Sequence, residues 1–361
     1  MVYFDQTLNH RVLQGLLLMK RICLKDIALE VNVSQTAVSK VLNGLPIRIG
    51  QEKKDKIIET AQRLGYSPDM IARGLRNRET KSIGIVIPDM STLFYPELLR
   101  SIEIKLSSHG YQTLICNSGD DPVGEREHIE TLLSRSVDGL VVAPTAGREN
   151  IDYFKQIHES KKPFILIDRY FAGEPLNYIV TDNKLGAQQG AGILAGRGVT
   201  RIFYLGNKIR NQSLDDRLAG VQDESVRRNI LFESDQVFLT ETDRNSVRET
   251  AERMLDNNLK RTGVFLESNR LLMGLLDAAC RKGLRIPDDF SVIGFDPFIA
   301  EMIYPGDFDS LQIIREPLSL IRQDTSGMVK AIDEYLVASL GKQPRQYVRK
   351  MLPAEIILGR V

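Results

Sequence analysis

Nine short aliphatic runs, separated by stretches whose apolar residues recur at helical spacing, place the strongest constraint on how this chain folds. They begin at residue 82 and read SIGIVIP, TLICN, GLVVAP, FILID, YIVTD, RIFYLG, VFLT, GVFLE and SVIGFD. Because their apolar residues are continuous instead of alternating, the runs predict strands buried on both faces, as in parallel α/β sheets. Nine strands are too many for one compact sheet of ordinary size, so we expect two sheets.

The segment from Leu24 to Asn43, LKDIALEVNVSQTAVSKVLN, predicts two short helices joined by a tight turn. The apolar stripe of the first helix comprises Ile27, Ala28 and Val31. Asn32 tolerates a positive φ angle and can end this helix in a left-handed conformation. Ser34 is then in place to cap the second helix.

The second helix is expected to expose a polar face made of Gln35, Thr36, Ser39, Lys40 and Asn43. Amide, hydroxyl and ammonium groups can bond to base edges in the major groove of DNA and to its phosphates. The pattern therefore favours a helix-turn-helix motif. On the pattern alone, an ordinary solvated helical hairpin is the alternative.

The distribution of charge favours nucleic-acid binding over that alternative. Residues 1–81 contain 14 Lys+Arg and 8 Asp+Glu, a net charge of +6, whereas the whole chain has 48 and 47, a net charge of +1. The remainder therefore has 34 and 39, a net charge of −5. A basic segment at one end of a mildly acidic body is typical of proteins that bind nucleic acid through that end.

Two further segments complete the N-terminal region. GQEKKDKIIETAQRLG predicts a third helix that ends at Gly65. Its inward side chains are expected to be Ile57, Ile58, Ala61 and Leu64. The next stretch, DMIARGLRNRETK, is basic and too short to form a stable helix alone. Its apolar side carries Ile71, Ala72 and Leu75.

Three of these motifs, LKDIALEVNVSQTAVSKVLNG, LGYSPDMIARGL and KSIGIVIPDMSTLFYPELLRSIE, resemble the lactose-repressor (LacI/GalR) family of bacterial transcription regulators in order and spacing. The resemblance runs from about Met19 to the C-terminus. It implies a small all-α helix-turn-helix headpiece plus an α/β two-lobe periplasmic-binding-protein-like core with parallel sheets. It also implies a homodimer that binds double-stranded, near-palindromic operator DNA.

The resemblance implies four segments. We expect residues 1–18 to be an N-terminal extension of no assigned role, residues 19–66 the headpiece, residues 67–80 a hinge helix and linker, and residues 81–361 the effector-binding and dimerisation core. The expected N-lobe is about 81–180 and 311–341, and the expected C-lobe about 181–310 and 342–361. The chain would cross between the lobes near Val180, Ser310 and Gly341.

Carried over to this chain, the family's DNA contacts fall in two places. Gln35, Thr36 and Lys40 would read bases, and Ser34, Ser39 and Asn43 would mainly contact phosphates. In the hinge helix, Ala72 and Leu75 are also assigned to DNA, with Leu75 as a wedge that kinks the duplex. A linker residue packed on the core is the alternative for Leu75. The chain departs from the family by having Lys40 where arginine is common, and lysine cannot make the two-pronged contact to guanine.

The N-terminus and the cysteines point to a cytoplasmic protein. The apolar run VLQGLLLM follows only one basic residue and precedes no small-residue cleavage pattern, so we expect neither a secretion signal nor a membrane span. The three cysteines, Cys23, Cys116 and Cys280, are far apart and have no metal-ligand spacing. We expect them to be reduced and mostly buried.

Polar residues that follow the predicted strands suggest a ligand site, because ligands of open α/β sheets bind beyond the carboxyl ends of strands. The candidates are Phe94, Tyr95, Asp168, Arg169, Ser213, Arg217, Arg270 and Asp296. The resemblance assigns Arg217 and Asp296 to effector hydroxyls, with a structural ion pair as the alternative. Phe94 and Tyr95 could stack on a sugar or pack in the core. Arg270 is either a contact to the ligand or a solvated residue at a helix start. As a contact it would suit an acidic ligand, which favours sugar acids and phosphates.

Enzymatic readings have weaker support. The glycines of GAQQGAGILAGRG have the wrong spacing for a dinucleotide fingerprint and are better explained by close helix packing. No catalytic or metal-binding motif is present in the sequence, and we expect no cofactor. We predict a sequence-specific DNA-binding regulator, a repressor of a carbohydrate-use operon, controlled by a sugar, sugar acid or sugar phosphate. The alternatives are a sugar-binding protein of the same fold without a regulatory role, and a nucleoside- or purine-responsive regulator.

Overall fold

A computed structural model describes residues 22–66, 79–91, 94–160, 162–296, 311–341 and 347–359. The chain divides between Arg78 and Glu79 into two compact units. The expected extension (residues 1–18) and the hinge helix with Ala72 and Leu75 lie outside the described residues. In the part of the chain that is described, no helix is long and apolar enough to span a bilayer.

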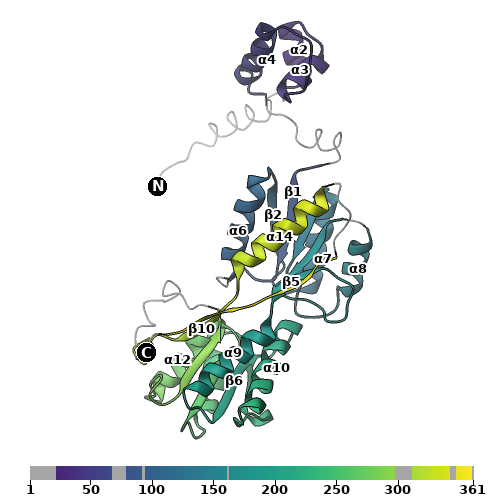
Figure 1. The fold of residues 1–361 in the computed structure, drawn as a ribbon. Coiled ribbons are helices and arrows are strands. Elements are labelled where there is room, and N and C mark those ends of the chain that lie inside the picture. Colours follow the sequence, from purple (N-terminus) through teal and green to yellow (C-terminus); the bar gives the residue numbers. More distant parts are fainter. Residues whose placement is uncertain are drawn as a thin grey trace, which may run out of the picture. The chain divides into compact units, whose positions relative to one another are not determined.

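Between residues 22 and 66, the first unit contains three short helices around one small core (Figure 1). They are α2 (Leu24–Val31), α3 (Gln35–Leu42) and α4 (Gln51–Arg63). Ile27, Val38 and Ile57 contribute one fully buried side chain each. Burial of each such side chain stabilises the fold by about 1.5–3 kcal/mol. An ion pair between Glu30 and Arg63 also joins α2 to α4.

The turn between α2 and α3 forms as the sequence predicts. Asn32 has a φ angle of 54° and ends α2 in the left-handed region. The hydroxyl of Ser34 caps α3 by accepting a 3.1 Å hydrogen bond from the backbone N–H of Ala37. The prediction of a helix-turn-helix headpiece is therefore confirmed.

The second unit contains two six-stranded sheets, each of which defines one lobe. The first lobe has the strand order β11-β5-β4-β3-β1-β2, and all of its pairs are parallel. The second lobe has the order β12-β10-β9-β8-β6-β7, in which only β12 is antiparallel to its neighbour. The predicted α/β core with two mostly parallel sheets is confirmed.

The strands of the first lobe are β1 (Ser82–Ile87), β2 (Gln112–Asn117), β3 (Gly139–Val142), β4 (Phe164–Ile167), β5 (Tyr178–Thr181) and β11 (Arg349–Leu352). Its helices are α6 (Phe94–Ser108), α7 (Pro122–Ser134), α8 (Ile151–Glu159) and α14 (Thr325–Leu340). Helices α6 and α14 pack on one face of the sheet, and α7 and α8 pack on the other. Figure 1 shows α6 and α14 side by side.

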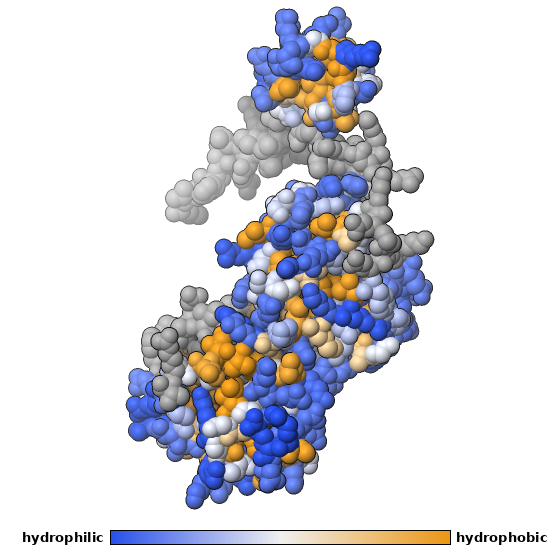
Figure 2. Space-filling view, viewed as in Figure 1, coloured by the Kyte–Doolittle hydropathy of each residue, from blue (hydrophilic) through white to orange (hydrophobic). Residues whose placement is uncertain are grey.

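The strands of the second lobe are β6 (Arg201–Asn207), β7 (Val237–Thr240), β8 (Thr262–Leu266), β9 (Ser291–Phe295), β10 (Ser319–Arg322) and β12 (Glu355–Ile357). Its helices are α9 (Asn183–Gly196), α10 (Gln212–Arg227), η1 (Ser234–Gln236), α11 (Arg244–Leu255), η2 (Asn269–Leu271) and α12 (Leu272–Arg281). Helices α9 and α10 cover one face of this sheet, and α11 and α12 cover the other. Figure 2 shows hydrophobic residues gathered around β10 on the visible face of this lobe.

The chain crosses between the lobes after β5, after β10 and after β11. The crossings expected near Ser310 and Gly341 are wrong, because β10 still belongs to the second sheet and β11 belongs to the first. Residues 311–322 therefore lie in the second lobe and residues 349–352 in the first. Gly341 is only the C-cap of α14 and does not leave the lobe.

Close packing accounts for more than one glycine of α9: a Cβ atom on Gly192 would lie 3.1 Å from Oε1 of Glu224 on α10. A Cβ atom on Gly190 would lie 2.5 Å from the side chain of Ile321 in the sheet below, which is too close for any larger residue without movement. Gly196 has open space around its Cα, so packing does not explain it.

Candidate functional site

The exposed face of α3 carries most of the side chains predicted to read DNA. Gln35 and Thr36 are exposed at its first turn, and Lys40 is partly exposed one turn later. Ser34 and Asn43, at the two caps, are exposed as well. An exposed helix face with amide and hydroxyl groups in the first turn and an ammonium group in the last is the arrangement by which helix-turn-helix proteins contact the major groove.

Ser39 departs from the prediction. It was expected on the outer face, but it is buried at 8% exposure. The amide of Asn43 donates to its carbonyl oxygen at 2.6 Å and lies 3.4 Å from its hydroxyl. The reason is that Ser39 directly follows the core residue Val38, and a helix of two turns packs a wide arc of its surface inward. Its position does not support a phosphate contact.

A second site is a cavity of about 460 Å³ between the two lobes of the core. This volume lies within the usual range of about 300–1,000 Å³ for small-molecule sites. All eight residues predicted for a ligand line it: Phe94, Tyr95, Asp168, Arg169, Ser213, Arg217, Arg270 and Asp296. The prediction that strand ends would bring these side chains together therefore agrees with their positions. Their role in binding an effector stays a prediction.

Three aspartates in the cavity lining have left-handed backbone conformations. Their φ angles are 59° for Asp120, 61° for Asp168 and 69° for Asp296. Positive φ is uncommon for residues other than glycine, and such conformations concentrate at functional sites. Here they occur where the chain turns sharply at the edge of the cavity.

Arg217 on α10 is fixed at the back of the cavity. Its Nε donates to Oδ1 of Asn183 at 2.8 Å, and its Nη1 donates to the carbonyl oxygen of Glu267 at 2.7 Å. The guanidinium lies 3.8 Å from the centre of the Phe295 ring. The side chain is buried, and neither of these hydrogen bonds is to a carboxylate. This differs from the simple structural ion pair considered as the alternative.

Asp296 follows β9 and lies in the same wall of the cavity. Burial raises the pKa of its carboxyl, and the nearby charge of Arg217 and a hydrogen bond from Gln323 oppose that rise. Nε2 of Gln323 donates to Oδ1 of Asp296 at 2.9 Å, while its own Oε1 accepts from the hydroxyl of Thr181 at 2.7 Å. The carboxylate is thus oriented by a side chain at the second crossing.

The first lobe contributes a network centred on Asp168. Its Oδ2 accepts a 2.5 Å hydrogen bond from the hydroxyl of Tyr95, and its carbonyl accepts one of 2.7 Å from Ser213 of the second lobe. Tyr95 is buried in the core of the first lobe, whereas Phe94 is partly exposed and packs edge-on against it at 5.2 Å. Tyr95 therefore serves core packing and the cavity at once, and only Phe94 offers a free ring face.

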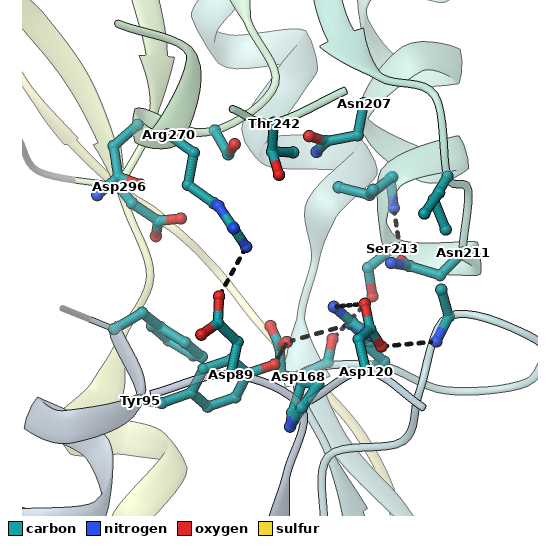
Figure 3. Close-up of a pocket in the computed structure, with 18 of the residues that line it drawn as sticks. Asp89, Tyr95, Asp120, Asp168, Asn207, Asn211, Ser213, Thr242, Arg270 and Asp296 are labelled. Atoms are coloured by element: carbon teal, nitrogen blue, oxygen red, sulfur yellow. Dashed lines mark hydrogen bonds and ion pairs between the residues drawn. The ribbon is translucent and has the colours of Figure 1, made fainter. Parts of the chain in front are cut away.

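The other two predicted arginines are already paired with carboxylates. Arg169 binds Asp120 at 2.7 Å and the carbonyl oxygen of Pro144 at 3.0 Å. Arg270 binds Asp89 at 2.8 Å (Figure 3). Among the lining residues that the structure describes, four are cations and five are carboxylates. The cations are Arg169, Lys208, Arg217 and Arg270, and the carboxylates are Asp89, Asp120, Asp168, Glu241 and Asp296.

This balance of charge bears on the kind of ligand. The described lining has no excess of cations over carboxylates, and Arg270 is already paired with Asp89. The expectation that Arg270 favours sugar acids and phosphates is therefore not supported by its surroundings. In the described residues, no group of histidine, cysteine or acidic side chains could hold a metal ion. The expectation that the cysteines are mostly buried is wrong, because Cys23 is exposed and Cys116 and Cys280 are partly exposed.

Several lining residues were not predicted from the sequence. Those with side chains suited to hydroxyl groups are Asp120, Asn207, Asn211, Thr242 and Gln323. Asn207 is the last residue of β6, so the strand-end argument could have found it. Gln323 follows β10, which was not predicted as a strand, so no signal pointed to it.

Together, the headpiece and the core define a class: DNA-binding proteins with a helix-turn-helix headpiece joined to a two-lobe, periplasmic-binding-protein-like core. The family of bacterial regulatory proteins named lacI matches residues 23–69, and a periplasmic binding protein-like domain matches residues 191–360. The HTH-type transcriptional repressor PurR of Mannheimia succiniciproducens is 30% identical over 279 residues, covering 76% of this chain and 81% of the relative.

Two further proteins extend the similarity over nearly the full length. The ribose operon repressor of Halalkalibacterium halodurans is 26% identical over 340 residues, covering 93% of this chain and 95% of the relative. The lac repressor dimer bound to operator and the anti-inducer ONPF has the same fold, with a TM-score of 0.81 at 20% identity over 94% of this chain and 98% of that one. The chain belongs to the LacI family, and it is a DNA-binding regulator of transcription.

Proposed function

We propose that this regulator represses a carbohydrate-use operon and that a small polyhydroxylated effector, bound between the lobes, controls its affinity for operator DNA. The cavity carries this proposal. It lies at the strand ends of both lobes and is lined by side chains that are oriented by hydrogen bonds before any ligand arrives. The family relatives named as repressors, one of them of a ribose operon, support it.

The DNA-reading residues of the proposal are those at the exposed face of α3. Gln35, Thr36 and Lys40 would contact bases, and Ser34 and Asn43 would contact phosphates. Ala72 and Leu75 of the hinge segment would enter the minor groove, an expectation that rests on the family resemblance alone. The operator would be double-stranded and near-palindromic, because a two-fold dimer places one recognition helix on each half-site.

The effector chemistry follows from the cavity. Arg217 and Asp296 lie in one wall and can bridge neighbouring hydroxyls of a pyranose, since a guanidinium donates and a carboxylate accepts. Phe94 can stack on the apolar face of the ring. Because carboxylates outnumber cations in the lining, we favour an uncharged sugar over a sugar acid or a sugar phosphate.

A homodimer is the proposed state of assembly. Strand β2 is at an edge of the first sheet and carries Ile115 at 44% exposure, and the adjoining helix α6 carries Ile104 at 57%. Large apolar side chains on an open edge strand favour pairing with a second chain. The solved lac repressor with the same fold is a dimer on its operator. We propose that the protein acts in the cytoplasm, where the chromosome is accessible to it.

A selection and a screen test this proposal. Purified full-length protein is used to select fragments of its own genome, and we expect enrichment of near-palindromic sites upstream of carbohydrate genes. A thermal-shift screen then covers neutral sugars, sugar acids, sugar phosphates, nucleosides and purines. A neutral sugar that stabilises the protein and changes operator affinity supports the proposal. A response only to purines or nucleosides would instead favour a nucleoside- or purine-responsive regulator. Absence of any selective DNA enrichment would refute it.

A further inference from the structure

One ion pair bridges the lobes at an edge of the cavity. Arg270, in η2 of the second lobe, places Nη1 at 2.8 Å from Oδ2 of Asp89, which follows β1 in the first lobe. The two residues are 181 positions apart in the sequence and belong to different lobes, so they meet only when the lobes lie close together. Figure 3 shows the guanidinium reaching across the cavity to the carboxylate.

The acidic partner is held in place by its own loop. Asp89 accepts 2.8 Å hydrogen bonds from both the backbone N–H and the hydroxyl of Ser91. These bonds restrict the carboxylate to one orientation, so little side-chain entropy is lost on its side when Arg270 arrives. Arg270 is 39% exposed and Asp89 is 24% exposed, so water and salt screen the pair and its contribution is modest.

Hydrogen bonds from α10 also join the lobes, away from this ion pair. Ser213 donates to the carbonyl oxygen of Asp168, and the hydroxyl of Tyr170 donates to Oδ2 of Asp216, both at 2.7 Å. In Figure 3, Ser213 lies across the cavity from Arg270. The cavity is therefore bridged at more than one place by the chain's own side chains.

We infer that Arg270 and Asp89 form a latch that stabilises the closed arrangement of the two lobes. Separation of this pair would let the lobes move apart and widen the entrance to the cavity. Parting the latch is also the change that an effector in the cavity can favour, by offering Asp89 hydroxyl donors in place of Arg270. The latch itself concerns only the core; its effect on operator affinity rests on the proposed function.

Interlobe distances in the full-length, effector-free protein test the latch. Spin labels replace Asp152 of α8 and Val226 of α10, two exposed positions in different lobes, in a chain whose three native cysteines are substituted. Dilution with unlabelled chains restricts the signal to distances within one subunit. We expect one narrow distance distribution for the unaltered latch and, for Arg270→Ala, a roughly two- to five-fold larger open fraction, as befits a partly exposed ion pair.

Three further variants separate the latch from general effects of charge. Lys208→Ala removes a cation from the same cavity, but Lys208 pairs with Glu241 in its own lobe at 3.4 Å, so the distribution should not change. Arg270→Lys keeps the charge and should keep most of the closure. Asp89→Ala combined with Arg270→Ala should open the core no further than either change alone, because both remove one shared contact.

A broad distribution in the unaltered protein, or one that Arg270→Ala leaves unchanged, would overturn the inference, as would equal opening by Lys208→Ala. Since the measurement contains neither DNA nor effector, its failure is distinct from failure of the proposed function. Operator affinity of Arg270→Ala, measured by fluorescence anisotropy, then tests the regulatory consequence. We expect a change of about two- to five-fold, and no change would show that the latch does not communicate with the headpiece.

Discussion

Replacing Arg217 by alanine should affect both the stability of the second lobe and the response to an effector. The guanidinium makes two hydrogen bonds, to Asn183 and to the carbonyl oxygen of Glu267, and stacks on Phe295. Hydrogen bonds from a charged donor contribute about 1.5–3 kcal/mol each. A desolvated cation–π contact adds about 2 kcal/mol. Removal of the charge also relieves the cost of burying it, so these contributions do not simply add.

We therefore expect Arg217→Ala to lower the free energy of unfolding by about 3–5 kcal/mol, because the loss of two hydrogen bonds from a charged donor and of the cation–π contact outweighs the relief of burying the charge. At about 2–4 °C per kcal/mol for a domain of 150–250 residues, Tm should fall by about 6–20 °C. Scanning calorimetry measures this change, and Lys208→Ala, at a side chain that is 68% exposed, serves as the control with little expected effect.

The same variant should bind operator DNA at 25 °C but show no response to the sugar identified by the thermal-shift screen. Isothermal titration calorimetry measures the loss of binding. A fall in Tm below about 2 °C would refute the structural part of this reasoning, because that would correspond to less than about 1 kcal/mol. Unaltered sugar binding would refute the assignment of Arg217 to the effector.

Three other changes test separate parts of the molecule. Lys40→Ala should lose about 1–3 kcal/mol of discrimination between operator and random DNA, measured by competition anisotropy. Lys53 is exposed on α4, and Lys53→Ala should leave the ratio of operator affinity to random-DNA affinity unchanged. If both variants change this ratio equally, Lys40 is not a base reader. Leu75→Ser should abolish DNA bending without affecting effector binding, and unchanged mobility differences in circularly permuted gel-shift probes would contradict the wedge. Burial raises the pKa of the Glu125 carboxyl above its ordinary 4.5, although hydrogen bonds from Asn150 and Thr145 oppose the rise. The protonated carboxyl therefore contributes fully to the stability of the fold below pH 4.5, and this contribution is lost as pH rises through the pKa of the folded state. Relative to Glu125→Gln, the wild type should thus be most stable in acid, and a difference in Tm that does not vary with pH would rule out this titration.

The strands that were predicted and those that were missed differ in a simple physical way. Each of the nine aliphatic runs became a strand, because a run of apolar residues leaves a continuous signal. The prediction that all of them are buried on both faces is wrong for the edge strands β2 and β7, which are partly exposed. Strands β10, β11 and β12 were missed because SLIR, RKML and EII are short and carry charged or hydroxyl side chains. All three flank the second and third crossings, and this is why the lobe boundaries there were wrong.

The candidate site also contains some residues whose positions the sequence predicts and others whose positions it does not. Residues that follow a recognisable strand, such as Asp168 and Asp296, could be placed at the cavity because parallel strands end at one edge of a sheet. The pairing of Arg270 with Asp89 could not, because it depends on two lobes meeting across 181 residues of sequence. The burial of Ser39 was also inaccessible, since helical periodicity gives a direction for each side chain but not the width of the surface that packing covers.

The two side chains proposed to bind the effector are held by hydrogen bonds to residues next to the points where the chain crosses between the lobes. Arg217 donates to Asn183, which begins α9 directly after the first crossing. Asp296 accepts from Gln323 at the second crossing, and Gln323 accepts from Thr181, the last residue of β5 before the first. A ligand that redirects either charged group must therefore disturb a hydrogen bond at the point where the lobes turn relative to each other. Allosteric coupling typically amounts to about 1–3 kcal/mol, and one or two hydrogen bonds at about 1 kcal/mol each are sufficient for it. Under the proposed function, no long chain of contacts through either lobe is needed to connect the cavity to the angle between the lobes.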